Sequence, residues 1–364
     1  MSEKEHIHGG APHASFERLG VSPRRVIDFS VNISPLGPPR AIFRNWDRLS
    51  GEISVYPSVD GGAVTEYYTH RFGIQPESVL PGNGSTECIY LVPRVLGIQR
   101  VCILTPSFHD YQRSCRVAGC EIVAYPLEPE TLFAPPSPMH LEKALADCDA
   151  LFLGHPNNPT GTLFETSDLL ALADCFPDKT FLIDEAFIQF LPDHSQRTLI
   201  APERIRPNIL VFHSLTKLYA LPGIRLGAVV GHPDTIGLLK RFKEPWTINS
   251  VAERVVRFLI DCGDYEDRLR SLVEKEQQRF IDQLKRSAGL SLYPTPCNFM
   301  LARWEQSDEL DDLLRFLLEH GIHVRDCRNF KGLEDRFFRF AILKTTENNR
   351  LIDLLTRCLQ EYQP

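Results

Sequence analysis

Short apolar runs, each followed by a polar or glycine-containing segment, recur along the first two thirds of the chain. Runs of this kind predict buried strands, at residues 79–80, 100–104, 120–125, 150–154, 180–183, 208–212 and 225–231. The segments between them predict helices, at residues 63–72, 111–118, 141–146 and 167–175. Repetition of strand, polar loop and helix is typical of an α/β fold whose mainly parallel sheet is covered by helices.

The pattern changes beyond residue 230. Helices are predicted at residues 233–242, 250–284 with a break near Gly263, 308–320 and 348–362, and strands at residues 291–294, 297–302, 322–327 and 336–342. This mixture predicts a smaller α+β domain at the C-terminus. We therefore expect an N-terminal arm at 1–40, a large domain at 41–243 and a small domain at 244–364.

The predicted arm lacks helical or strand periodicity over most of its length. Its apolar content argues against disorder, so we expect an extended segment that lies on a surface. Glycine lets a backbone approach a ligand closely, which makes His8-Gly9-Gly10 a candidate contact. The alternative is a flexible start whose histidines have no function.

Polar or ligand-contacting residues follow the predicted strands of the large domain, at Gly84, Phe108, Asn158, Asp184 and Lys217. In sheets of this kind, ligands bind beyond the carboxyl ends of the strands. Their repeated placement predicts a binding site at one edge of the sheet.

Lys217 lies between two buried strands, in a segment of apolar and small residues. A lysine removed from water loses its proton more readily and can form a Schiff base with an aldehyde. The alternative is a lysine that extends its ammonium group to solvent. The segment Pro81–Thr86 is a second candidate, because a glycine-rich turn before a helix offers N–H groups to a phosphate, although capped helix starts are common.

Composition limits the classes of function. The net charge of −7 does not favour a nucleic-acid partner, and no apolar run approaches the length of a membrane span. The ten cysteines are scattered without CxxC pairs or zinc spacing, so we predict buried free thiols and no metal site. The first residues lack the apolar core of a secretory signal, which predicts a cytoplasmic protein.

Together these segments resemble the fold type I pyridoxal-phosphate enzymes, in the branch of the histidinol-phosphate aminotransferases. The resemblance covers nearly the whole chain and rests on residues 158–161, 184–186, 214–217 and Arg225, in this order. Within the branch the chain is most similar to the L-threonine-O-3-phosphate decarboxylases of cobalamin biosynthesis. The marks of that similarity are His8-Gly9-Gly10, Asp28-Phe29-Ser30 with Asn32, the turn at 35–37, and the strand from Arg325 to Cys327.

The resemblance implies pyridoxal 5′-phosphate as cofactor and assigns a role to each coenzyme-binding residue. Lys217 would carry the coenzyme and move protons, Asp184 would pair with the ring nitrogen, Asn158 would bind the ring oxygen, and Phe108 would stack on the ring. The phosphate ligands would be Gly84, Ser85, Thr86, Ser214 and Arg225, with Tyr56 from a second subunit, so a homodimer is implied. Phe187 stands where many relatives have a tyrosine, and it cannot donate to the ring oxygen.

The resemblance also implies a phosphorylated amino-acid substrate. Arg339 would receive its α-carboxylate, and Arg325 with His8 and Asn32 would bind its phosphate. Gly9 and Asn158 would also contact the substrate. On spacing alone, each arginine could equally form a structural salt bridge.

The expected reaction is decarboxylation of L-threonine-O-3-phosphate to (R)-1-amino-2-propanol O-2-phosphate. The alternatives are O-phosphoserine decarboxylation and a histidinol-phosphate aminotransferase, since the bond broken depends on an angle that the sequence does not show. A ligand-sensing regulator of the same fold is disfavoured, because the residues before the fold are few and not basic.

Overall fold

The computed structural model describes residues 26–285, 288–306 and 309–361. Its main element is a seven-stranded sheet in the order β2-β8-β7-β6-β5-β3-β4. The strands are β2 (Val79–Asn83), β3 (Arg100–Thr105), β4 (Glu121–Pro126), β5 (Ala150–Gly154), β6 (Thr180–Asp184), β7 (Ile209–Ser214) and β8 (Leu226–Gly231). Neighbouring strands are parallel except where β8 meets β2 and β7. The predicted mainly parallel sheet is confirmed.

Successive side chains of the central strands enter two different core clusters. In β5, Leu151 and Leu153 belong to one cluster, and Ala150 and Phe152 belong to the other. The first cluster includes residues of α4 (Gly62–Phe72), α7 (Pro138–Leu145), α8 (Thr166–Cys175) and α12 (Ser250–Leu259). The second includes residues of α5 (Ser85–Leu96), α6 (His109–Val117) and α11 (Pro233–Lys240). Helices cover both faces, which is why these strands are apolar along their whole length.

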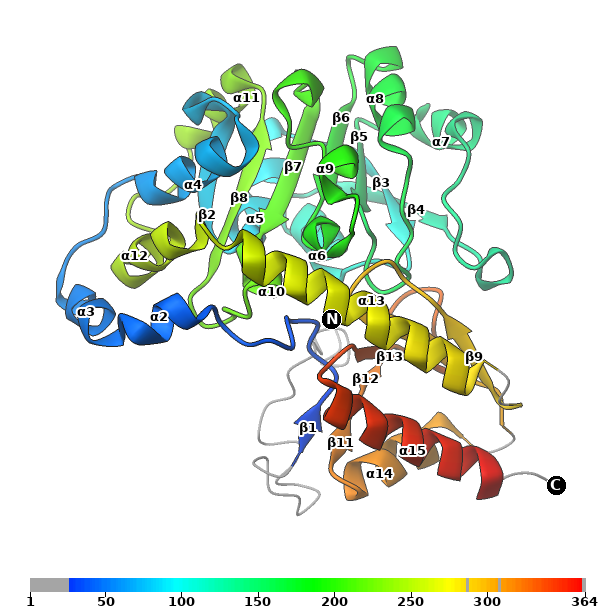
Figure 1. Ribbon diagram of the computed structural model, residues 1–364. Helices are drawn as coiled ribbons and strands as arrows, with labels where there is room; N and C mark the ends of the chain where they lie inside the picture. The colour runs from blue at the N-terminus through cyan, green and yellow to red at the C-terminus, as the bar shows by residue number, and fades with distance from the viewer. Residues whose placement is uncertain (1–25, 286–287, 307–308, 362–364) are drawn as a thin grey trace.

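The C-terminal part contains a four-stranded antiparallel sheet in the order β12-β13-β10-β9. Its strands are β9 (Leu290–Tyr293), β10 (Phe299–Trp304), β12 (Arg325–Asp326) and β13 (Phe337–Ala341), and α14 (Leu310–Glu319) and α15 (Thr345–Glu361) share its core. The long helix α13 (Gly263–Leu284) runs from the large sheet to this smaller one (Figure 1). Its early residue Leu269 packs in the large core, whereas Phe280 packs in the small one.

The domain boundary near residue 244 stays a prediction. Helix α12 lies beyond this boundary, yet it packs against α4 of the large domain. It also packs against α2 (Arg40–Arg44) and α3 (Trp46–Gly51), two helices that the sequence pattern did not predict. The predicted strand at 322–327 is interrupted at Val324. Its first half, β11 (Ile322–His323), pairs with β1 (Ile27–Asp28) of the arm, and its second half is β12. Because β11 pairs with β1 of the arm and β12 pairs with β13, the predicted strand at 322–327 is divided between two sheets.

The described part of the arm joins the two domains. The main chain of Phe29 receives a hydrogen bond from Ala341 N–H at 2.8 Å, and its own N–H donates to His323 O at 2.7 Å. Farther along, Ser34 N–H donates to the carbonyl of Lys217 at 2.9 Å. The arm thus links the small sheet to the segment that follows β7. None of the described helices is long and apolar enough to cross a membrane.

Candidate active site

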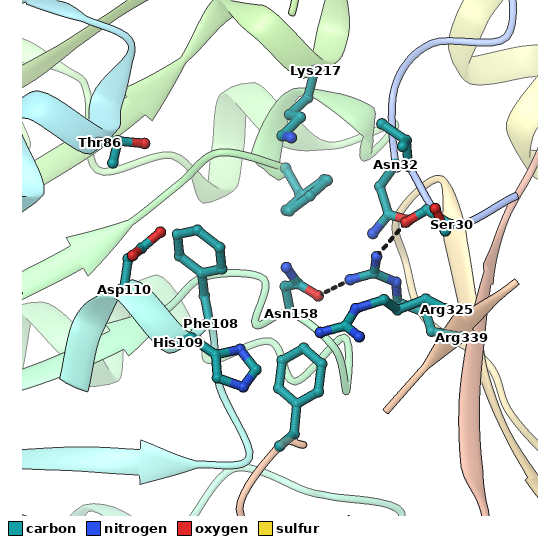
Figure 2. A pocket seen from close by; sticks show the side chains of 13 residues that line it. Ser30, Asn32, Thr86, Phe108, His109, Asp110, Asn158, Lys217, Arg325 and Arg339 are labelled. Carbon is teal, nitrogen blue, oxygen red and sulfur yellow. Dashed lines mark hydrogen bonds between the residues drawn. The ribbon is translucent and has the colours of Figure 1, made fainter. Parts of the chain in front are cut away.

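Most of the predicted site residues meet at one edge of the large sheet, where two pockets adjoin. Both pockets are lined by Thr86, Phe108, Asn158, Phe187 and Lys217. The inner pocket adds Tyr111 from α6 and residues at or beside the strand ends: Ser85, Asp184, Ser214, Thr216 and Arg225. The outer pocket adds residues from the arm, α6 and the small domain: Ser30, Asn32, His109, Arg325, Phe330 and Arg339. Figure 2 shows that side chains from both domains point into the outer pocket.

Lys217 lies in α10 (Leu215–Leu218), a single helical turn directly after β7. Its side chain is partly buried, and its Nζ makes no hydrogen bond to any described residue. Burial and the positive charges of Arg339 and Arg225 together lower the pKa of the Lys217 ammonium to about 8, while the charge of Asp184 opposes that fall. A substantial fraction of this amine is therefore neutral near neutral pH, as a nucleophilic amine requires.

Asp184 is the last residue of β6 and is buried. Its Oδ2 accepts a hydrogen bond from the Tyr111 hydroxyl at 2.8 Å, and its Oδ1 accepts one from Ala186 N–H at 2.9 Å. Burial raises the pKa of the Asp184 carboxyl to about 6, while the two hydrogen bonds and the charge of Lys217 oppose that rise. A buried carboxylate fixed in this way suits a positively charged ligand atom.

The start of α5 forms a cradle for an anion. Gly84 has a φ of 72°, and a Cβ placed there would lie 2.6 Å from Nη2 of Arg225. Gly227 permits the same approach from β8, because a Cβ there would lie 2.4 Å from Ser85 N. Arg225 itself has a left-handed backbone, with a φ of 63°, and its carbonyl accepts from Gly84 N–H at 3.1 Å. The backbones therefore meet closely enough to place an arginine beside a helix N-terminus.

Phe108, Asn158 and Phe187 line both pockets beside Lys217. Phe108 caps α6, with its ring 5.6 Å from that of Tyr111, and it lines both pockets. Asn158 accepts a short hydrogen bond from Arg339 through its Oδ1 (Figure 2). Phe187 packs edge-on against Phe299 at 5.1 Å and offers no donor.

The outer pocket contains two buried arginines that lie directly opposite each other across β12 and β13. Arg339 donates to the main-chain carbonyl of Ser30 at 2.8 Å, while its Nε has no partner. Arg325 donates to Asp326 O at 2.6 Å and to Asn329 Oδ1 at 2.9 Å. Burial lowers the pKa of both guanidinium groups, that of Arg339 to about 10. Within the described residues Arg339 forms no ion pair with a carboxylate, so a structural salt bridge there does not explain its burial.

Asn32 also belongs to the outer pocket. Its side chain is only 3% exposed, and neither its Oδ1 nor its Nδ2 has a hydrogen-bond partner. A buried amide costs free energy unless it is paired, so this side chain is suited to a polar ligand.

Among the described residues, the predicted ligand Tyr56 lies away from both pockets. Tyr56 is 86% exposed and lies beside Trp246, with the ring centroids 6.2 Å apart. His8 and Gly9 lie outside the described residues, so their assignment stays a prediction.

Sequence reasoning missed several residues that line the site, including Tyr111, His109, Ser30, Thr216 and Phe330. Tyr111 lies three residues after Phe108, and that helical spacing is a signal that could have indicated it. Ser30 acts through its main-chain carbonyl, which leaves no mark in the sequence.

The inner pocket fits pyridoxal phosphate. The Lys217 amine with its lowered pKa matches the coenzyme aldehyde, and the buried Asp184 carboxylate matches the ring nitrogen. The Phe108 ring matches the face of the coenzyme ring, and the anion cradle at the start of α5 matches the phosphate. Thr216 lines this pocket, and its Oγ1 is buried without a hydrogen-bond partner. Such an orphaned group is expected where a polar ligand binds.

Comparison with known proteins agrees with this geometry. The profile of the Aminotransferase class I and II family matches residues 24–355. A Salmonella typhimurium protein named threonine-phosphate decarboxylase is 35% identical over 364 residues, which is 98% of each chain. The crystal structure of L-threonine-O-3-phosphate decarboxylase from Porphyromonas gingivalis has a TM-score of 0.80 at 25% identity, covering 91% of this chain and 99% of that one.

Aminotransferases are also similar. The crystal structure of the histidinol-phosphate aminotransferase from Clostridium acetobutylicum has a TM-score of 0.84 at 27% identity, covering 92% of this chain and 99% of that one. These matches confirm the resemblance that the motifs indicate, the fold and the coenzyme. The chain belongs to the aminotransferase class I and II family.

Proposed function

We propose that this enzyme decarboxylates L-threonine-O-3-phosphate to (R)-1-amino-2-propanol O-2-phosphate, for the assembly of cobalamin. The observation that carries the proposal is the opposition of Arg325 and Arg339 across two strands in one pocket. Like charges placed directly opposite each other destabilise a sheet. A substrate with two anionic groups, a carboxylate and a phosphate, offsets that repulsion. The relative that is 35% identical over nearly the whole chain supports the same substrate.

The inner pocket would perform the coenzyme-dependent part of the reaction. When bound, pyridoxal phosphate supplies an aldehyde for amine attack and a ring that takes up the electrons of the broken bond. The Lys217 amine is the nucleophile, and it later delivers a proton to the α-carbon that has lost CO2. Asp184, held by Tyr111, keeps a negative charge at the ring nitrogen, and Arg225 with the start of α5 binds the coenzyme phosphate.

The outer pocket would orient the substrate. Arg339 is fixed by Ser30 O and Asn158, and its planar fork matches a carboxylate. Arg325 and Asn32 would bind the phosphate at the other end of the substrate. Holding both ends determines which bond to the α-carbon is aligned for cleavage. We assign the choice of decarboxylation to this two-point attachment.

Tyr56 supports a shared active site in a homodimer. Its ring lies 6.2 Å from that of Trp246, which is also exposed, and other large apolar side chains are exposed at Phe43, Trp46, Ile53, Val55, Val59 and Phe242. Exposed aromatic side chains such as those of Tyr56 and Trp246 are typical of a protein interface. A second copy on this surface would bring its Tyr56 to the phosphate cradle. Mixed dimers of Lys217→Ala and Tyr56→Ala chains should then recover activity that neither variant has alone, and no recovery would contradict the shared site.

A reducing compartment suits the thiols. All ten cysteines are free, nine of them buried, and none forms a disulfide. Disulfides are rare in the cytosol, so the free thiols support a cytoplasmic enzyme.

A product assay tests the proposed reaction. The holoenzyme is incubated with L-threonine-O-3-phosphate, O-phosphoserine or histidinol phosphate, with and without an oxo acid. We expect CO2 from L-threonine-O-3-phosphate without any oxo acid. O-phosphoserine lacks one methyl group, and a group of that size changes rates by about 10- to 200-fold. We therefore expect O-phosphoserine to react more slowly by a factor in that range. Oxo-acid-dependent amino transfer from histidinol phosphate, together with no CO2 from L-threonine-O-3-phosphate, would establish the aminotransferase instead.

A further inference from the structure

His109 is the first residue of α6 and lines the outer pocket. Its Nε2 lies 2.8 Å from the main-chain carbonyl of Asn329. A carbonyl only accepts hydrogen bonds, so Nε2 carries the hydrogen of this contact, and Nδ1 is the second nitrogen of the ring. Figure 2 shows this second nitrogen on the side of the ring that is turned toward Asn158 and the arginines.

His109 and Arg325 are held by the same small segment. Asn329 accepts from His109 through its carbonyl and from Arg325 through its side chain. The ring of Phe330 lies 4.4 Å from the His109 ring, and the Arg325 guanidinium lies 5.2 Å from the Phe330 centroid. Residues 329–330 therefore bring a large-domain imidazole and a small-domain guanidinium to one end of the pocket.

The charges at this end of the pocket favour an anion. Lys217, Arg325 and Arg339 line the pocket with His109, whereas Asp110 is the one carboxylate among the lining residues that the structure describes. The carboxylate of Asp110 already accepts a hydrogen bond from Tyr90 at 2.7 Å. Among the described lining residues, positive charges therefore outnumber negative ones.

We propose that His109 is a specificity-determining residue that binds the phosphate of the substrate through Nδ1, together with Arg325. This inference rests on the proposed function. A phosphate dianion accepts from the imidazolium, and a phosphate monoanion can donate to the neutral ring. His109 contacts the phosphate, and Arg339 contacts the carboxylate.

Two substitutions separate the ring nitrogens. The amide of His109→Asn can replace Nδ1, whereas that of His109→Gln can replace Nε2 and keep the contact with Asn329. We expect His109→Gln to raise the KM for L-threonine-O-3-phosphate by about 10- to 100-fold, the effect of losing a charged hydrogen bond, with a much smaller change in kcat. His109→Asn should stay within a few-fold of the wild-type KM. A higher KM for His109→Asn than for His109→Gln would show that His109 only supports the loop at Asn329. Equal KM values in the wild-type protein and both variants would also overturn the proposal.

Binding of inorganic phosphate to the holoenzyme provides a readout that does not need turnover. Bound coenzyme fills its own phosphate cradle, so added phosphate reports on the outer pocket. We expect calorimetric titration to show weaker phosphate binding to His109→Gln than to His109→Asn. Equal affinities would contradict the role of His109, whereas absence of CO2 release by the wild-type protein would contradict only the proposed reaction.

Discussion

The inner and outer pockets share five side chains but are built in different ways. The inner pocket takes most of its residues from the ends of neighbouring strands in one sheet, as Asp184 ends β6 and Lys217 follows β7, and adds Tyr111 from α6. The outer pocket combines the arm, α6 and the small antiparallel sheet. Coenzyme binding is thus a property of one sheet, and substrate choice is a property of how separate segments meet. Substitutions in the two pockets should therefore have separable effects.

Lys217→Ala should have the largest effect. Loss of the amine removes both the attachment of the coenzyme and the proton transfer, so kcat should fall by at least about 10³-fold. The absorbance band of the attached coenzyme should disappear as well. Lys240→Ala, at an exposed position of α11, is the matched control and should retain both activity and band. An unchanged band in Lys217→Ala would remove Lys217 from its role.

Arg339→Lys should impair the use of the substrate without weakening the binding of the coenzyme. A lysine keeps the charge but loses the planar fork, so kcat/KM should fall by about 10- to 100-fold. The Kd for pyridoxal phosphate should stay within a few-fold of the wild-type value, because Arg339 lies outside the inner pocket. An equal loss of coenzyme affinity, measured by fluorescence titration, would contradict the comparison.

Tyr111→Phe should affect the inner pocket through the charge of Asp184. The tyrosine hydrogen bond lowers the pKa of this carboxyl, so its loss lets burial raise the pKa above about 6. Asp184 then loses its negative charge at a higher pH. We expect coenzyme affinity to fall by about tenfold at neutral pH, with the acidic limb of its pH profile moved upward. A limb that stays in place would show that Tyr111 does not tune Asp184.

Tyr265→Phe should have the smallest effect. The Tyr265 hydroxyl lies 2.6 Å from Ser34 Oγ and 2.8 Å from Gly37 O, so it holds the arm near the carbonyl of Lys217. Loss of these buried hydrogen-bond contacts should lower the free energy of unfolding by about 1 to 2 kcal/mol and change kcat/KM only two- to threefold. Denaturant titration and kinetics measure the two effects. A large rise in the coenzyme Kd would mean that the arm also shapes the inner pocket.

The difference in construction explains what the sequence could predict. Asp184, Asn158 and Lys217 follow apolar runs, and parallel pairing brings the ends of such runs to one edge. No comparable rule places Arg325 opposite Arg339, because that pairing depends on the register of two antiparallel strands. Likewise, the contact between Tyr111 and Asp184 exists only once α6 packs on β5, where the Tyr111 and Phe152 rings stack at 4.3 Å.

The identity of the bond that breaks at the α-carbon is the most direct test of the account. L-threonine-O-3-phosphate is incubated with the holoenzyme in D2O, and the product and the recovered substrate are examined by NMR. The account predicts CO2 release, one deuteron beside the original hydrogen on the aminated carbon of the product, and no deuterium in recovered substrate. Deuterium at the α-carbon of recovered substrate without CO2 release would show that the hydrogen is removed instead, and would contradict the account.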